Sequence, residues 1–395
     1  MARMLPHERI DSRRTASIYL HFPYCTVRCR YCDFNVARVT EIPRADYTAA
    51  VRAESDLRLP EIAGRDVLSI YFGGGTPSLW GAAGVADTLA HLVAATRAVA
   101  PEVTLEANPN EAADGALLAA YVQAGITRLS LGLQAVTDAE LHILGRSHDA
   151  PLGLAALDVA VRTFPAVTVD LIFGLPGSTA ASWRDTLVRV LDTGVDHLSL
   201  YHLTVEPRTG LERAVRDGRL SLPTEDVAAD QWELIEPTLA SYGLHAYEIS
   251  SYCRPGFESL HNTGYWLGQP YLGLGAGAHS FSGWRPGGAR RRENLRPHKE
   301  YLRAAMSGQD PVGTEELVSR DDHRDERVMT GLRYGSGVDL EALGAELELD
   351  ASCGLEERLA PLLREGVVEV IGGRLRLTPR GRSLADAVTR RLLAG

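Results

Sequence analysis

The sequence contains few cysteines and no long apolar run. Five cysteines occur among 395 residues, and three of them fall close together, which is not the pattern of a disulfide framework. We therefore expect a reducing, cytoplasmic compartment. The first fifteen residues mix Arg, His, Glu and Asp with small residues, unlike a secretory signal. No run of about 18 apolar residues follows, so we expect no membrane span, while contact at the membrane surface stays open.

The chain also has fewer basic than acidic residues. The chain has 41 Lys and Arg against 51 Asp and Glu, a net charge of -10, which argues against a general nucleic-acid-binding surface. We expect no nucleic-acid partner. The composition, 45% hydrophobic and 23% charged, and the length suit one large α/β body with an appended piece.

The clustered cysteines lie in a short stretch that follows an apolar segment. The spacing Cys25-x-x-x-Cys29-x-x-Cys32 on a loop lets three thiolates converge on one small inorganic body, as iron–sulfur ligation requires. A cubane cluster held this way has one open iron, where a substrate or cofactor can bind, as at catalytic metal sites. A structural zinc site with His21 as its fourth ligand is the alternative.

Apolar segments alternate with helical stretches from Ser17 onward, the sequence form of repeated βα units on a parallel sheet. Six such units predict an α/β fold, a partial and open version of the eightfold βα barrel. A helix is expected at 44–58. Strands are expected at 17–22, 67–72, 103–107, 128–134, 168–173 and 197–203.

The character of the sequence changes after Pro311. Helical spacing at 324–332, 339–347 and 355–365 and a hairpin at 367–378 predict a winged-helix-like α+β domain, with a packing or docking role. We thus divide the chain into an N-terminal extension (1–16), a core (17–310) and this domain (311–395). The basic run 285–296 is expected to be a solvated loop, with contact to acidic propionates or anionic lipid as the alternative.

Polar residues end several of the predicted strands, at the edge where such folds bind ligands. They include Glu106, Gln134 and Asp170. Each alone could merely cap a helix or satisfy a nearby backbone group, but the repetition favours a site. The run Gly73-Gly74-Gly75-Thr76, after the second strand, lets the backbone approach a ligand closely.

The cysteine motif resembles that of the radical S-adenosylmethionine (SAM) superfamily, Cys-x-x-x-Cys-x-aromatic-Cys, which Cys25, Cys29, Tyr31 and Cys32 match. This resemblance implies a [4Fe–4S] cluster whose open iron chelates the amino and carboxylate groups of SAM. It also implies that an electron from the cluster splits the sulfonium and releases a 5′-deoxyadenosyl radical. The glycine run is similar to the superfamily's motif for the SAM amino group.

Further motifs over about residues 17–280 resemble the oxygen-independent coproporphyrinogen III dehydrogenase branch of that superfamily. Chemically, Glu106 and Asp170 suit ammonium or ribose hydroxyl groups, and Arg146 suits a carboxylate. The cofactor-binding residues that the resemblance implies are Tyr19, Tyr31, Gly74, Gly75, Thr76, Glu106, Gln134, Arg146, Asp170 and Ile172.

Two features are more similar to the heme chaperones (HemW) of this branch than to the dehydrogenase. The dehydrogenase continues the cluster motif as Cys-x-Cys, whereas this chain reads Cys32-Asp33-Phe34. The stretch 261–266 matches the chaperones' His-Asn-x-x-Tyr-Trp motif, which implies heme contacts with an axial imidazole and aromatic rings against the macrocycle. The implied heme residues are His261, Asn262, Tyr265 and Trp266. The alternative is a surface turn whose aromatic residues are core anchors.

The sequence is therefore compatible with two alternative functions. The first is a heme chaperone that binds heme, the cluster and SAM and delivers heme to hemoproteins such as membrane respiratory enzymes. The second is the dehydrogenase, which decarboxylates porphyrinogen propionates to vinyl groups. Phe34 and the 261–266 stretch favour the first, so enzymatic activity stays open and no catalytic residue is assigned. A homodimer is also left open.

Overall fold

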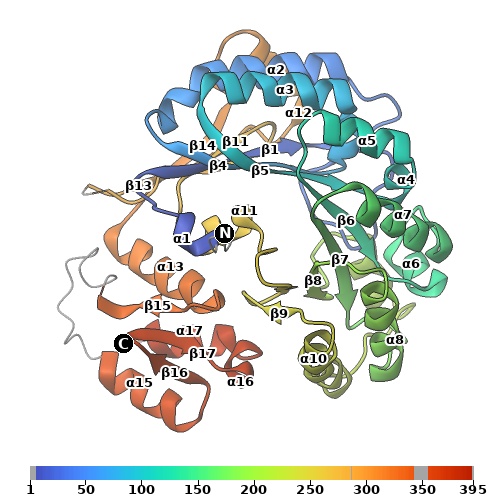
Figure 1. Cartoon of the computed structure of the whole chain (residues 1–395), viewed down its shortest axis with the longest axis vertical. Helices are drawn as coiled ribbons and strands as arrows, with labels where there is room; N and C mark the ends of the chain where they lie inside the picture. The colour runs from blue at the N-terminus through green and yellow to red at the C-terminus, as the bar shows by residue number, and fades with distance from the viewer. Residues whose placement is uncertain (1–5, 286, 342–354, 394–395) are drawn as a thin grey trace.

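The computed structural model describes residues 6–285, 287–341 and 355–393. Its centre is a 12-stranded sheet in the order β14-β13-β12-β11-β1-β4-β5-β6-β7-β8-β10-β9. Six neighbouring strands run parallel and in chain order: β1 (Thr15–Phe22), β4 (Asp66–Gly74), β5 (Arg97–Ala107), β6 (Arg128–Gln134), β7 (Val167–Phe173) and β8 (His197–His202). The sheet curves but stays open (Figure 1), so the predicted partial barrel is confirmed.

Helices cover the convex face of this sheet (Figure 1). The first, α2 (Arg44–Arg58), has the predicted bounds and buries Tyr47, Ala50, Val51 and Glu54 at the spacing of one helical face. The others between the six strands are α3 (Ala82–Ala95), α4 (Pro109–Ala112), α5 (Gly115–Gln123), α6 (Asp138–Leu144), α7 (Ala150–Thr163) and α8 (Ala180–Leu191). After β8 come α9 (Gly210–Arg216) and α10 (Glu225–Ala240), and later α12 (His298–Met306).

The sheet continues beyond the six strands at both edges. Beside β8 lie the antiparallel β10 (Ser251–Cys253) and β9 (His245–Ala246). Beside β1 lies β11 (Tyr271–Leu274), which is parallel to it. Three antiparallel strands then follow: β12 (His279–Phe281), β13 (Ala289–Asn294) and β14 (Val312–Val318).

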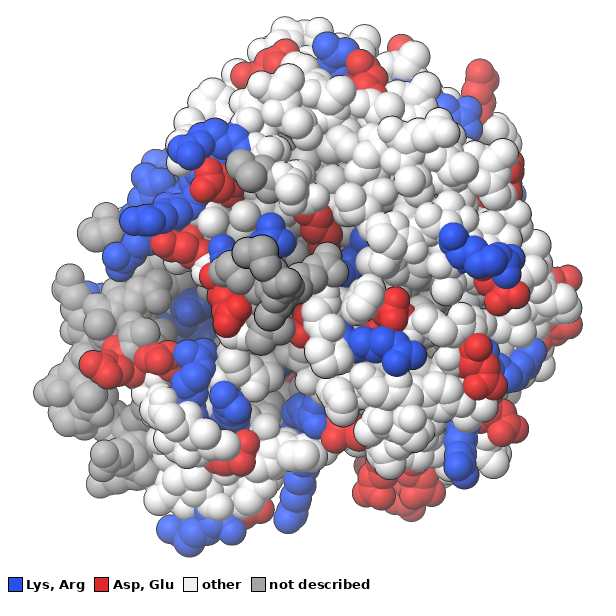
Figure 2. Space-filling model, in the orientation of Figure 1, with Lys and Arg blue, Asp and Glu red and all other residues white. Residues whose placement is uncertain are grey.

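The loop predicted over the basic run 285–296 was wrong in its central half, which forms β13 (Ala289–Asn294). Its arginines are not simply solvated: Arg290 pairs with Glu315, and Arg291 with Glu316 and Glu326. Figure 2 shows basic side chains beside acidic ones at the edge of the molecule where Figure 1 places β13. Opposite charges across neighbouring strands stabilise the pairing, so the run was able to form a strand.

The concave face of the sheet carries α11 (Leu260–Trp266), which packs on β1 and β4, and the short α1 (Pro6–Arg9) beside it (Figure 1). Below them lies the C-terminal part, with its own apolar core around Leu332, Leu362 and Leu375. Its elements are α13 (Arg320–Arg333), β15 (Val338–Asp339), α15 (Leu355–Arg364), β16 (Val368–Ile371), β17 (Arg374–Leu377), α16 (Pro379–Arg382) and α17 (Ala385–Leu393).

The predicted C-terminal hairpin is confirmed as β16 and β17, which β15 extends to three strands. The helix predicted at 339–347 lies mostly outside the described residues. The division of the chain at residues 17 and 311 stays a prediction. Within the described ranges, no helix combines the length and the apolar character that a membrane crossing requires.

Candidate functional site

The three clustered cysteines lie on the loop that follows β1. Cys25 is buried at the end of β2 (Tyr24–Cys25), which pairs with β3 (Ala37–Arg38) and so closes the loop. Cys29 and Cys32 are half-buried between these two strands. All three line one cavity of about 140 Å³. The loop therefore brings three sulfur donors to a shared space.

Each of two thiols has a fixed partner. Thr76 Oγ1 donates to Cys25 Sγ at 3.4 Å, and Arg146 Nη1 donates to Cys29 Sγ at 3.3 Å. Burial raises the pKa of the Cys25 thiol, and it raises the pKa of Cys32 to about 11. Thiolates at these positions therefore need a positively charged partner, which a metal cluster supplies.

The arrangement suits a cluster better than a single metal ion. In a cluster each of three thiolates binds a different iron, whereas a structural zinc ion needs four ligands. The histidine of the zinc alternative is engaged elsewhere. His21 Nδ1 lies 3.1 Å from Tyr19 Oη and Nε2 lies 2.9 Å from Asn35 O. The zinc alternative therefore lacks its fourth ligand here.

The glycine run packs directly against the cysteine loop. Gly74 has φ 113°, a conformation that favours glycine. A Cβ on Gly75 would lie 2.7 Å from Tyr24 O and 3.0 Å from Cys25 Sγ. The backbone N–H groups of both glycines already have hydrogen-bond partners: Gly74 N donates to Glu106 Oε2, and Gly75 N donates to Phe22 O. These glycines thus contribute close approach to the cavity and not amide donors.

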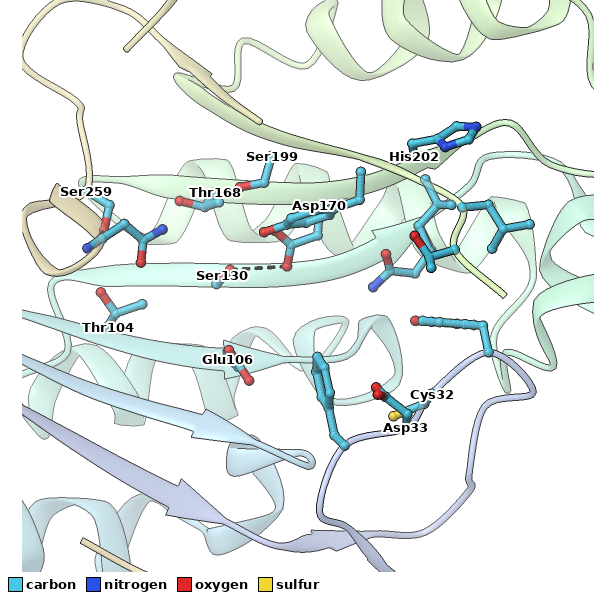
Figure 3. A pocket seen from close by; sticks show the side chains of 18 of the residues that line it. Cys32, Asp33, Thr104, Glu106, Ser130, Thr168, Asp170, Ser199, His202 and Ser259 are labelled. Carbon is cyan, nitrogen blue, oxygen red and sulfur yellow. Dashed lines mark hydrogen bonds between the residues drawn. The ribbon is translucent and has the colours of Figure 1, made fainter. Parts of the chain in front are cut away.

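Two carboxyl groups point into the cavity system from β5 and β7 (Figure 3). Burial and the neighbouring Asp170 raise the pKa of Glu106 to about 7, although Tyr71 Oη donates to it at 2.9 Å. Burial raises the pKa of Asp170 to about 6, against hydroxyl donors on Ser199 and Ser130. Both groups therefore change charge near neutral pH and can accept hydrogen bonds from an ammonium or hydroxyl group.

The end of β6 is irregular where it meets this cavity. A register shift separates Gly132 from Gln134, and Gln134 has φ 71°, a strained conformation of the kind found at binding sites. Arg146 Nη2 donates to Gly132 O and to Asn108 Oδ1, both at 2.6 Å. The guanidinium group is thereby fixed in the wall beside Cys29.

The structure gathers the residues predicted for the cofactors around three adjoining cavities. Ile172 lines a second cavity of about 300 Å³, and Tyr19 lines a third of about 700 Å³. The first cavity, of about 140 Å³, is lined by Cys25, Cys29, Tyr31, Cys32, Gly74, Gly75, Thr76, Glu106, Gln134, Arg146 and Asp170. The individual contacts of these residues with SAM stay predictions.

The second cavity contains side chains that we did not predict from the sequence. They are hydroxyl groups that alternate with the predicted residues along the strands, and Figure 3 shows them in the wall. They could have been predicted from the sequence, because alternate residues of a strand share one face, and these residues lie two positions from other polar residues of the same strands. The missed residues are Thr104, Ser130, Thr168 and Ser199.

The histidine of the predicted heme motif is buried in α11 and only 2% exposed. His261 Nδ1 lies 2.9 Å from Ser69 Oγ, and Nε2 lies 3.0 Å from Tyr265 Oη. Its ring stacks on Tyr71 with centroids 4.8 Å apart, and burial lowers its pKa to about 3. Both nitrogens are thus occupied, and His261 anchors α11 on the sheet.

The other residues of the motif point in different directions. Asn262 lines the second cavity and Tyr265 lines the third, whereas Trp266 packs against the apolar cluster that contains Tyr247 and Tyr334. Heme contact by the four residues stays a prediction. A direct bond from one nitrogen of His261 to iron would require the hydrogen bond at that nitrogen to be broken.

The chain matches the Radical SAM superfamily over residues 19–190 and the HemN C-terminal domain over residues 318–384. The heme chaperone HemW of Mycobacterium tuberculosis is 39% identical over 95% of this chain and 94% of its own length. The mitochondrial radical S-adenosyl methionine domain-containing protein 1 of Bos taurus is 36% identical over 98% of this chain and 90% of its own length.

A solved structure agrees with this assignment. Coproporphyrinogen III oxidase HemN of Escherichia coli, a radical SAM enzyme, superposes with a TM-score of 0.81 at 25% identity, over 96% of this chain and 90% of that one. The superfamily implies a [4Fe–4S] cluster and SAM, in agreement with the thiols and the cavity described above. This chain belongs to the HemW family of the radical SAM superfamily.

Proposed function

We propose that the protein is a heme chaperone that delivers heme to hemoproteins such as membrane respiratory enzymes. The observation that carries this proposal is Phe34, which is 61% exposed and lines all three cavities. It stands where the dehydrogenase has an additional cysteine. An exposed aromatic ring offers an apolar surface to a porphyrin, but it supplies no thiol. The names of the 39% identical relatives support the same function.

The cluster and SAM belong to the same proposal. Cys25, Cys29 and Cys32 would hold a [4Fe–4S] cluster, which supplies an electron and an open iron when bound. Arg146, fixed beside Cys29, suits the SAM carboxylate, and Glu106 suits the ammonium group or a ribose hydroxyl group. The cavity is therefore equipped to hold a charged nucleoside beside the cluster.

A second candidate is oxygen-independent coproporphyrinogen III dehydrogenase activity. The likeness to HemN over 96% of the chain favours it. So does the second cavity, where Glu106 and Asp170 lie among hydroxyl groups. The two candidates differ in whether the porphyrin is cargo or is converted.

Where the chaperone acts is also part of the proposal. We place the chain in the cytoplasm, with heme handed over at the membrane surface when the acceptor is a respiratory enzyme. A homodimer is compatible with this role. Copurification of a respiratory acceptor with the heme-loaded chain, but not with the heme-free chain, would support the handover.

The test compares heme transfer with porphyrinogen conversion in anaerobically reconstituted protein. We expect the chain to bind hemin and pass it to an apo-hemoprotein, and to leave coproporphyrinogen unchanged in the presence of SAM and reductant. HemN assayed in parallel is the positive control for conversion. Robust conversion by this chain, without hemin transfer, would establish the second candidate instead.

A further inference from the structure

The third cavity, of about 700 Å³, lies between the cysteine loop and the strands β11 and β12. Its volume is within the range of about 300–1,000 Å³ that is typical of small-molecule sites, and it is larger than the two cavities beside it. Aromatic side chains form part of its wall, and basic side chains lie at its rim: Tyr19, Phe34, Tyr265, Tyr271, Arg28 and Arg296. Three carboxylates, those of Asp33, Glu106 and Glu293, belong to the same wall, and Glu293 pairs with Arg296. The aromatic rings suit a flat apolar ligand, and the arginines suit acidic groups on it.

One histidine of this wall is accessible. The His279 side chain is 50% exposed at the start of β12, whereas the two nitrogens of His21 are engaged by Tyr19 and Asn35. His261 lies behind Tyr265 and does not line the cavity. His279 is therefore the histidine of this wall whose imidazole could coordinate the iron of a bound ligand.

The position of His279 is set by a carboxylate and by a tight loop. His279 Nε2 lies 3.6 Å from Glu293 Oε1, and the two residues face each other across β12 and β13. The ring can turn about χ2, so either nitrogen can face this carboxylate. A carboxylate beside a ligating histidine fixes the ring and raises its basicity. The site thus supplies a partner that metal-binding histidines usually have.

The loop before His279 is attached to the cysteine loop. Asn35 Nδ2 donates to Ala276 O at 3.1 Å and to Arg296 O at 3.0 Å. A Cβ on Gly277, which has φ 74°, would lie 2.3 Å from Asn35 Nδ2. The wall that carries His279 and Arg296 is therefore held against the wall that carries Phe34.

We propose that heme binds in this third cavity with His279 as an axial ligand of its iron. Arg28 and Arg296 would pair with the propionates, Arg296 beside its ion-pair partner Glu293, and Phe34 and Tyr265 would offer apolar surface to the macrocycle. Glu293, also in the wall, lies beside His279. Glu293 is a positioning residue, because it orients the ring of His279. His261 does not contact the heme in this arrangement and only holds Tyr265 in place. This inference rests on the proposed function and names its binding site.

The test is hemin titration of the full-length, reconstituted protein, followed by Soret absorption and resonance Raman spectroscopy of the iron ligation. We expect Glu293→Gln to weaken binding about tenfold, and His279→Ala to weaken it more and to change the ligation spectrum. Free imidazole should restore the histidine-type spectrum of His279→Ala. His202→Ala is the matched control, because His202 is an exposed histidine in the wall of the second cavity.

The outcomes separate the inference from the proposed function. If the unaltered protein binds no hemin, the proposed function itself fails. If it binds hemin and His279→Ala has the same affinity and spectrum, only the site is wrong. Loss of binding in His202→Ala, with His279→Ala unchanged, would move the heme to another cavity and overturn the inference. His279 is half-exposed, and thermal unfolding of both variants checks that they fold.

Discussion

At the scale of single residues, Glu106 is a carboxyl group that the fold holds close to neutrality. Its pKa is about 7 in the folded chain, above the ordinary value of 4.5, because burial and Asp170 disfavour its charge. The folded state therefore holds more protons than the unfolded state between these values, and this contribution to stability falls as the pH rises from about 4.5 to 7. A charged Glu106 is thus costly to the protein without its ligands.

Replacement of Glu106 by Gln should separate stability from function. At pH 8 the free energy of unfolding of the ligand-free protein should rise by about 1–3 kcal/mol, because the buried charge is removed, while SAM binding weakens. Urea unfolding at pH 5 and pH 8 measures the first effect and calorimetry the second. The gain should be smaller at pH 5. An equal loss of stability at both pH values would contradict this account of Glu106.

Gly75 provides a second residue-scale prediction. A Cβ there would meet backbone oxygens of Phe22 and Tyr24 within 3 Å, and backbone cannot yield as a flexible side chain can. Gly75→Ala should cost about 1–3 kcal/mol and reduce the iron bound after reconstitution. Gly115→Ala is the matched control, since its Cβ would meet only Val159 Cγ1 at 3.5 Å. Equal iron contents in the two variants would show that the cysteine loop tolerates the change.

At the scale of elements, local patterns predicted the six parallel strands and the helix α2. Such strands can be predicted from consecutive residues alone, because a short apolar run is accompanied by Gly, Cys or a carboxylate, as in β4 and β7. The strand β13 could not be read this way, because its arginines depend on Glu315 and Glu316, about 25 residues later in the chain. The buried position of His261 depends on Ser69, 192 residues away, and no short motif contains that information.

The helix α11 therefore carries a prediction about the motif that it contains. His261→Ala removes two buried hydrogen bonds and the stacking on Tyr71. We expect the free energy of unfolding to fall by about 2–4 kcal/mol. If hemin affinity also falls, it should fall because the protein is less stable. Urea unfolding beside hemin titration measures both. Weaker hemin binding at unchanged stability would instead indicate a direct bond from His261 to heme.

At the scale of the whole molecule, the C-terminal part is attached to the barrel near the concave face. Tyr334, which follows α13, packs with Tyr247 and Cys253 of the barrel and contacts His7 of α1. Gly335 N donates to Tyr247 O at 2.8 Å. Segments from both ends of the chain thus meet beside α11, and the support of this helix depends on the complete fold.

Tyr334→Ala should loosen this junction. Loss of the buried ring should cost about 3–5 kcal/mol and should increase hydrogen exchange of α11 and α13. Tyr334→Phe keeps the ring and removes only a hydroxyl group, so it should cost about 1 kcal/mol. Exchange measured by mass spectrometry distinguishes the variants. Unchanged exchange in Tyr334→Ala would show that the two parts are held together elsewhere.

The central claim is that three thiols hold an iron–sulfur cluster with one open iron, at which SAM binds beside Arg146 and Glu106. The most direct measurement is iron and sulfide analysis of the anaerobically reconstituted chain, together with the electron paramagnetic resonance spectrum of the reduced cluster with and without SAM. We predict about four irons per chain, a spectrum that SAM changes, and loss of both in the Cys25, Cys29 and Cys32 to Ser variant. Protein that contains zinc without iron, or a cluster spectrum that SAM leaves unchanged, would contradict the claim.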